Sequence, residues 1–252
     1  MFPISDESAR RHRYPYVNIA LLAINVVVFF YTISLRGENQ ELFFLRYGLI
    51  PDRLMRLPFE PNPYFQFGSM SPEVPAWATL FTSMFIHGGV LHILGNMVFL
   101  WVFGDNVESR LGHVPYLIFY LAGGVAAAFS QIAIDPQSLA PVVGASGALA
   151  AVLGAYFVLY PFNQIKTIVV FIFITVIRLP AVWLLCFWLV LQFFDGITSL
   201  APGVRGGGVA YWAHIGGFLA GMLAIALLKL VVWREPLVQR RAHPFDAWRL
   251  RR

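Results

Sequence analysis

The sequence predicts an all-α integral membrane protein, built as a bundle of six transmembrane helices. Hydrophobic residues occupy 58% of the 252 positions and charged residues only 12%, about half the share found in an average soluble domain. The mean hydropathy is +0.68. Apolar runs long enough to cross a bilayer recur along the chain. Basic residues gather on one side of these runs, which is typical of membrane proteins.

Six apolar runs define the expected membrane helices. They lie at about residues 14–35, 83–104, 114–134, 146–161, 180–198 and 209–233. The first run follows a basic segment, but it continues for about 20 residues without an A-x-A site, so we expect a retained helix and not a cleaved signal peptide. A further apolar stretch at 165–177 is too short to span, and we expect it at the membrane interface.

The distribution of Lys and Arg sets the expected orientation. With both tails in the cytosol, 13 of the 18 Lys and Arg residues lie inside. We therefore expect residues 1–13 to form a cytosolic arm, 14–233 the membrane domain and 234–252 a basic cytosolic tail. The same asymmetry accounts for the net charge of +5, so no nucleic-acid partner is expected.

Polar residues in the second, fourth and sixth expected helices fall at one depth. The second carries His87, His92 and Asn96, the fourth begins at Ser146, and the sixth carries His214. All three helices would run from outside to inside, so each polar group lies in the outer part of its helix. Such groups are costly inside a membrane and often mark function. A single buried site toward the outer face is therefore expected.

Small residues indicate how two of these helices could meet. Ser146 and Gly154 lie on one stripe of the fourth helix, and Gly217 and Gly221 share a face with His214 on the sixth. Stripes of small residues let membrane helices approach closely. Packing of these two faces would make Ser146 and His214 neighbours.

A serine beside a histidine can act as a nucleophile with its general base. The base takes the serine proton and later protonates the leaving group. The developing oxyanion needs donors, for which the backbone N–H of Ser146, the ring of His92 and the amide of Asn96 are candidates, and Gly144 completes the predicted oxyanion set. The nearest acidic residue is Asp195, which is not at this depth, so we predict a Ser–His dyad and not a triad.

Each residue taken alone has a simpler interpretation. Ser146 could be a helix-packing serine, His214 a proton-relay or hydrogen-bonding histidine, and His92 with Asn96 a link between helices. His87 is expected to have a structural role. A transporter or proton channel would need polar groups across the whole bilayer, whereas the inner halves read "VFLWVF" and "LAIALL". No Cys/His cluster has metal-ligand spacing, so we expect neither a metal nor a cofactor.

Together these residues resemble the motifs of the rhomboid family of intramembrane serine proteases. The matching segments are Gly144-Ala145-Ser146-Gly147, similar to the family's G-x-S-G box, His92-x-x-x-Asn96, similar to its oxyanion motif, Ala213-His214-x-x-Gly217-x-x-x-Gly221, similar to its histidine helix, and the "GDNVE" of 104–108. The likeness covers about residues 14–233.

The resemblance implies a rhomboid-like six-helix bundle of the bacterial type around a water-filled cavity that opens outward. Such enzymes hydrolyse a peptide bond in or near the transmembrane segment of a membrane-protein substrate. Ser146 would be the nucleophile, His214 the base, and His92 with Asn96 the oxyanion stabilisers. The chain departs from some members at Ala150, where they carry an aromatic residue that stacks on the histidine.

The resemblance leaves alternatives for the activity, the membrane and the route to the site. The main alternative is an inactive relative that binds membrane clients; such proteins usually lack the Ser or the His, and both are present here. We expect the plasma (inner) membrane, with an organelle membrane as the other possibility. The substrate and the oligomeric state are left open. The loop at 199–209 is one candidate cap over the site, and entry past the fifth helix, near Trp183 and Phe187, is another.

Overall fold

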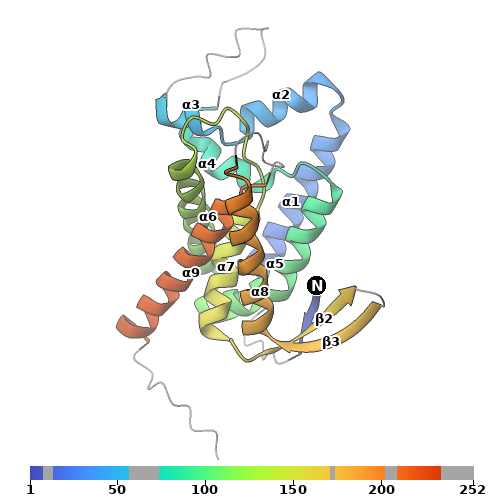
Figure 1. Ribbon diagram of the computed structural model, residues 1–252, viewed down its shortest axis with the longest axis vertical. Helices are drawn as coiled ribbons and strands as arrows, with labels where there is room; N and C mark the ends of the chain where they lie inside the picture. Colours follow the sequence, from blue (N-terminus) through green and yellow to red (C-terminus); the bar gives the residue numbers. More distant parts are fainter. Residues whose placement is uncertain (8–13, 57–73, 171–173, 202–208, 234–252) are drawn as a thin grey trace, which may run out of the picture.

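In the computed structural model the chain forms a bundle of helices with a small sheet at one end (Figure 1). The structure describes residues 1–7, 14–56, 74–170, 174–201 and 209–233. Within these ranges five helices are long and apolar enough to cross a membrane: α1 (Tyr16–Ser34), α5 (Val90–Leu111), α6 (His113–Ile134), α8 (Ala181–Thr198) and α9 (Tyr211–Val231). The prediction of an integral multi-pass membrane protein is therefore confirmed.

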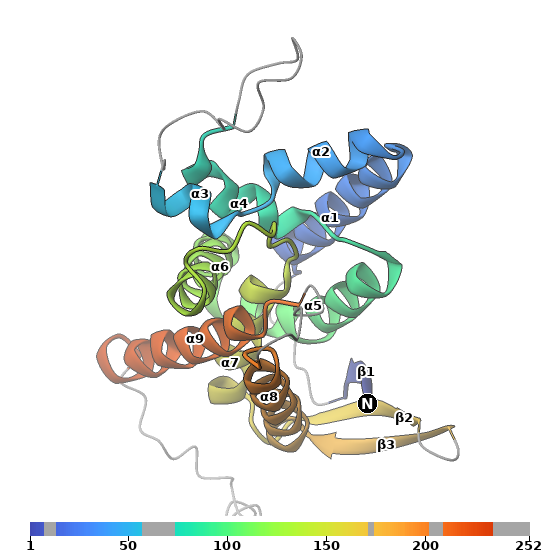
Figure 2. The same ribbon diagram turned by 45° about the horizontal axis from the view of Figure 1, so that its top comes forward.

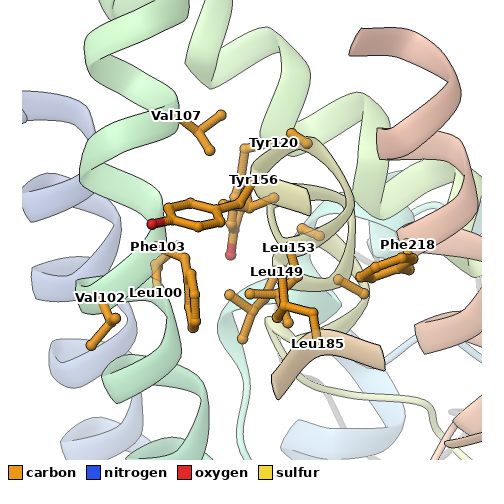
Figure 3. Packing of buried hydrophobic residues seen from close by; sticks show 14 of the residues in the cluster. Leu100, Val102, Phe103, Val107, Tyr120, Leu149, Leu153, Tyr156, Leu185 and Phe218 are labelled. Carbon is orange, nitrogen blue, oxygen red and sulfur yellow. The ribbon is translucent and has the colours of Figure 1, made fainter. Parts of the chain in front are cut away.

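The fourth predicted span is shorter than expected and lies at the centre of the bundle. It is α7 (Ser146–Leu159), an apolar helix of 14 residues. Figure 2 shows it surrounded by α5, α6, α8 and α9. In Figure 3 its side chains Leu149, Leu153 and Tyr156 lie between Phe103 of α5 and Phe218 of α9. Every residue from Ala148 to Tyr156 is buried, which explains why α7 has no polar face.

The second predicted span is displaced along the sequence. It was expected at 83–104, but α5 begins at Val90 and continues to Leu111. The residues before it form short turns: α4 (Thr79–Thr82) and two 3-10 helices, η1 (Ala76–Ala78) and η2 (Ser83–Phe85). Gly88 and Gly89 precede the helix, and glycine disfavours helix because it loses more backbone entropy than other residues on folding.

The stretch at 165–177, which was expected at the membrane interface, contributes to two paired β-strands beside the mostly helical bundle. Strands β2 (Gln164–Val170) and β3 (Ile174–Pro180) pair antiparallel, and β1 (Phe2–Asp6), from the predicted N-terminal arm, pairs antiparallel with the other edge of β2. The strands are rich in Ile, Val and Thr, whose branched side chains suit a sheet. Ile165 and Thr167 are fully buried against the bundle.

A buried carboxylate joins α1 to α5. Glu108 accepts hydrogen bonds from the backbone N–H groups of Val17 (3.0 Å) and Asn18 (2.7 Å), the first turn of α1. The N-terminus of α1 has no side-chain cap of its own. Glu108 thus satisfies donors that have no partner inside their helix, and its charge suits the positive end of the helix dipole. His113 contacts the same carboxylate at 2.6 Å.

The predicted small-residue packing of α7 on α9 is confirmed. A Cβ added at Gly154 would lie 2.0 Å from the carbonyl oxygen of Phe218, and one at Gly221 would lie 2.0 Å from that of Ala151. Neither position has room for a side chain, so the two backbones meet directly, as small residues allow in membranes. This close crossing sets the distance between the first turns of α7 and α9.

Two further helices, α2 (Glu38–Tyr47) and α3 (Pro51–Arg56), lie at the opposite end of the bundle from the sheet (Figure 1). The chain enters α1 and leaves α9 at the end where the sheet lies (Figure 1), so the described chain begins and ends on one side. The basic tail at 234–252 lies outside the described residues.

Candidate functional site

The geometry of the site centres on a serine and a histidine from α7 and α9. Ser146 is the first residue of α7, and His214 lies in the first turn of α9. The Nε2 atom of His214 lies 2.7 Å from Oγ of Ser146, within hydrogen-bond distance. His214 is buried, with 8% of its surface exposed, and Ser146 is half-buried. The two residues therefore meet inside the bundle, where the small faces were expected to bring them together.

The second nitrogen of His214 contacts a residue that sequence reasoning missed. Its Nδ1 atom lies 2.6 Å from Oε1 of Gln192, a buried residue of α8. Asp195, the acidic candidate, lies one turn further along α8 and is exposed. One signal could have pointed to Gln192: it is a lone amide in an apolar membrane helix, where polar residues are costly and often functional.

An aromatic ring also contacts His214, but from a different helix than the resemblance implied. Position 150 is alanine, and the ring of Trp188 on α8 lies 5.8 Å from the His214 ring with an interplanar angle of 34°. Trp188 and Gln192 are four residues apart and so share a face of α8. One face of α8 therefore supplies both contacts.

The predicted oxyanion residues lie on the α5 side of Ser146. His92 and Asn96 are on the first two turns of α5, and the Nδ2 atom of Asn96 donates to the carbonyl of His92 at 2.8 Å. This uses one of the two N–H groups of the amide and leaves the other. The backbone N–H of Ser146 also remains a candidate donor, since the first N–H groups of a helix have no partner within it.

Gly144 has a different place in the site from the one expected. Its N–H donates to the carbonyl of Ser83 at 2.9 Å, so it is not a free donor for an oxyanion. Its φ of 132° lies in a region that favours glycine. A Cβ at this position would lie 2.8 Å from Nε2 of His92 and 3.4 Å from Oγ of Ser146. Gly144 therefore leaves open the space between these two side chains.

His87 supports the loop that carries the serine. It is buried before α5, and its Nε2 atom accepts the N–H of Ala145 at 3.4 Å. Its ring lies 5.0 Å from that of His92. The structural role that the sequence predicts for His87 stays a prediction. The Oδ1 atom of Asn96 is buried without a protein partner among the described residues.

A small cavity adjoins the serine. Its volume is about 30 Å³, and its lining includes Ser83, Met84, Gly124 and Gly147 beside Ser146. This space is sufficient for about one water molecule. Among the described residues, no group of three His, Cys, Asp or Glu side chains comes together as a metal site.

The fold and site define a multi-pass membrane protein with a buried Ser–His pair at the head of a short central helix. The chain belongs to the rhomboid family, since the model of the Rhomboid domain matches residues 75–230, more than half of its length.

Three curated relatives are similar over about three fifths of this chain. They are presenilin-associated rhomboid-like protein A, mitochondrial, of Danio rerio (30% identical, covering 62% of this chain and 39% of the relative), rhomboid protease GluP of Bacillus subtilis (28%, 61% and 26%) and rhomboid-related protein 2 of Mus musculus (34%, 60% and 48%). The alignments thus span between about a quarter and a half of these relatives' own lengths.

Proposed function

We propose that this protein is an intramembrane serine endopeptidase, which hydrolyses a peptide bond in or near the transmembrane segment of a membrane-protein substrate. The observation that carries the proposal is the 2.7 Å contact between Nε2 of His214 and Oγ of Ser146. Family membership supports it, and one relative is named as a rhomboid protease.

The proposed reaction follows from this pair. His214 takes the proton of Ser146 as the serine oxygen attacks the substrate carbonyl, and it then gives that proton to the leaving amine. The oxyanion would be held by the N–H of Ser146, the ring of His92 and the remaining N–H of Asn96. Water then hydrolyses the acyl-enzyme, with His214 again as base. The cavity of about 30 Å³ beside Ser146 has room for that water.

The inactive client-binding relative is the competing interpretation. It requires no alignment between a nucleophile and a base. In this chain both residues are present and within hydrogen-bond distance, which favours the protease. The proposal includes both termini in the cytosol of the plasma (inner) membrane and a site toward the outer face, and the excess of Lys and Arg at the chain ends supports that orientation.

The decisive experiment compares the purified full-length protein with Ser146→Ala on a model single-span substrate in proteoliposomes. Cleavage by the wild type alone supports the proposal. Equal cleavage by both would point to a contaminant and remove Ser146 from the mechanism. If neither cleaves, labelling by a fluorophosphonate separates two cases: a labelled Ser146 is a competent nucleophile that needs another substrate, and an unlabelled one favours the inactive relative.

A further inference from the structure

We propose that Gln192 is the positioning residue of His214, and that it fixes the ring in the tautomer that can accept the serine proton. This inference rests on the proposed function, because it concerns how the same site is held. Oε1 of Gln192 lies 2.6 Å from Nδ1 of His214, on the opposite side of the ring from Ser146.

The hydrogen-bonding capacity of each atom determines which tautomer His214 adopts. An amide oxygen only accepts hydrogen bonds, so its contact requires the proton of the neutral imidazole to be on Nδ1. The Nε2 atom then carries the lone pair and faces the hydroxyl of Ser146. The opposite tautomer would place an N–H against the hydroxyl and leave no base. Gln192 thus has the orienting role that a carboxylate has in a catalytic triad, but without a charge.

Among the residues that the structure describes, Gln192 is the one whose side chain contacts Nδ1 of His214. From α9 itself, the ring of Tyr211 lies 6.5 Å away and nearly perpendicular, which is a ring contact. From α6, Gln131 reaches the backbone N–H of Ala213 at 3.3 Å. From α5, the titratable neighbour is His92. From α8, Trp188 contributes a ring face and Gln192 contributes the acceptor at Nδ1.

The location of Gln192 on α8 links the base to the placement of this helix. Over its most apolar segment, only 22% of α8 is buried within the protein. This is the lowest share among the five long apolar helices of the described chain. Trp183 and Phe187 on its outer face are 67% and 45% exposed. A helix with so little burial packs on the rest of the protein over a small area, yet it carries the acceptor that sets the tautomer. We infer that His214 is a competent base only while α8 is in this position.

The test compares three substitutions on α8 in the full-length protein. Gln192→Met keeps the length of the side chain but removes the oxygen that accepts from Nδ1 of His214. Gln192→Glu keeps an accepting oxygen. Asp195→Asn is the matched control on the same helix. Cleavage of the model substrate gives kcat and KM between about pH 5 and pH 9, where histidine titrates. Fluorophosphonate labelling of Ser146 gives a second rate that needs no peptide.

We expect Gln192→Met to lower kcat by about 10- to 100-fold with little change in KM, since Gln192 acts through the base. Gln192→Glu should retain most of kcat, and its acidic limb should move to higher pH because a carboxylate favours the imidazolium. Asp195→Asn should behave as the wild type. A Gln192→Met protein with wild-type kcat and pH profile would overturn the inference. An equal loss of kcat in Gln192→Met and Gln192→Glu would also overturn it, because the residue would then only pack α8.

The proposed function fails differently. If the wild type neither cleaves the substrate nor is labelled, Ser146 is not a working nucleophile and the proposed function is wrong. A wild type that reacts, beside a Gln192→Met variant that reacts equally fast, removes only the positioning role.

Discussion

Nε2 of His214 and Oγ of Ser146 lie 2.7 Å apart although 68 positions separate them in the sequence. If they act as one unit, removing either should cost nearly as much as removing both. We predict that Ser146→Ala and His214→Ala each lower kcat by about 1,000-fold or more, and that the double variant is no slower than the worse single variant. The measurement is residual cleavage at high enzyme concentration. Losses that multiply in the double variant would mean that the two residues act separately.

Gly144 offers a test of the space between His92 and Ser146. In Gly144→Ala the new methyl would lie 2.8 Å from Nε2 of His92, and the φ of 132° would be strained. We predict a drop of about tenfold or more in kcat, with the protein still folded, since the cost of one strained residue is about 1–3 kcal/mol. Gly88→Ala is the control, because nothing lies within 4 Å of its added Cβ. If both substitutions lowered kcat equally, the loss would not come from the space at Gly144.

The crossing of α7 and α9 should be sensitive to a single methyl group. Gly221→Ala would place a carbon 2.0 Å from the carbonyl oxygen of Ala151, and the backbones would have to separate. We predict a loss of about 1–3 kcal/mol in the free energy of unfolding, measured by denaturation in mixed micelles. Gly95→Ala, on α5, has open space around the added Cβ and should leave stability unchanged or slightly raised. A stable Gly221→Ala protein would contradict the close crossing.

The link between α1 and α5 makes a prediction about stability alone. Glu108→Ala leaves the N–H groups of Val17 and Asn18 without their acceptor, so we expect a loss of about 1–3 kcal/mol. The first part of the chain to open should be α1, seen as faster hydrogen exchange in its first turn. Glu38→Gln is the matched control, because Glu38 is exposed on α2. Equal stability of the two variants would mean that Glu108 does not anchor α1.

Much of the fold could be predicted because the membrane imposes strong rules on sequence. Long apolar runs identified the five long helices, and the stripes containing Gly154 and Gly221 predicted which helices cross closely. The hairpin was missed because Ile, Val and Thr residues at 165–177 suit an interfacial helix or a strand by hydrophobicity alone. The pairing partner that favours the strand, β1, is more than 150 residues away in the sequence.

The candidate site was partly predictable for a related reason. Ser146, His214, His92 and Asn96 stood out as polar residues at one depth, and they remain predictions of role until activity is measured. Gln192 was not predicted: the only third member considered from the sequence was an acid, Asp195, and it was set aside in favour of a Ser–His dyad. Which residues of α8 face α9 depends on the rotation of the helix, which a nearly continuous apolar sequence does not specify.

The short length of α7 has a consequence for the depth at which Ser146 lies in the membrane. Its 14 residues span about 21 Å, whereas the hydrocarbon core of a bilayer is about 30 Å thick. A helix of that length can reach at most one surface of the membrane, so if its C-terminal end lies at the inner surface, Ser146 at its head lies below the outer one. The length of α7 would therefore set the depth of Ser146 in the membrane. Under the proposed function, a substrate bond would be selected first by its depth in the membrane, and only then by the residues that flank it.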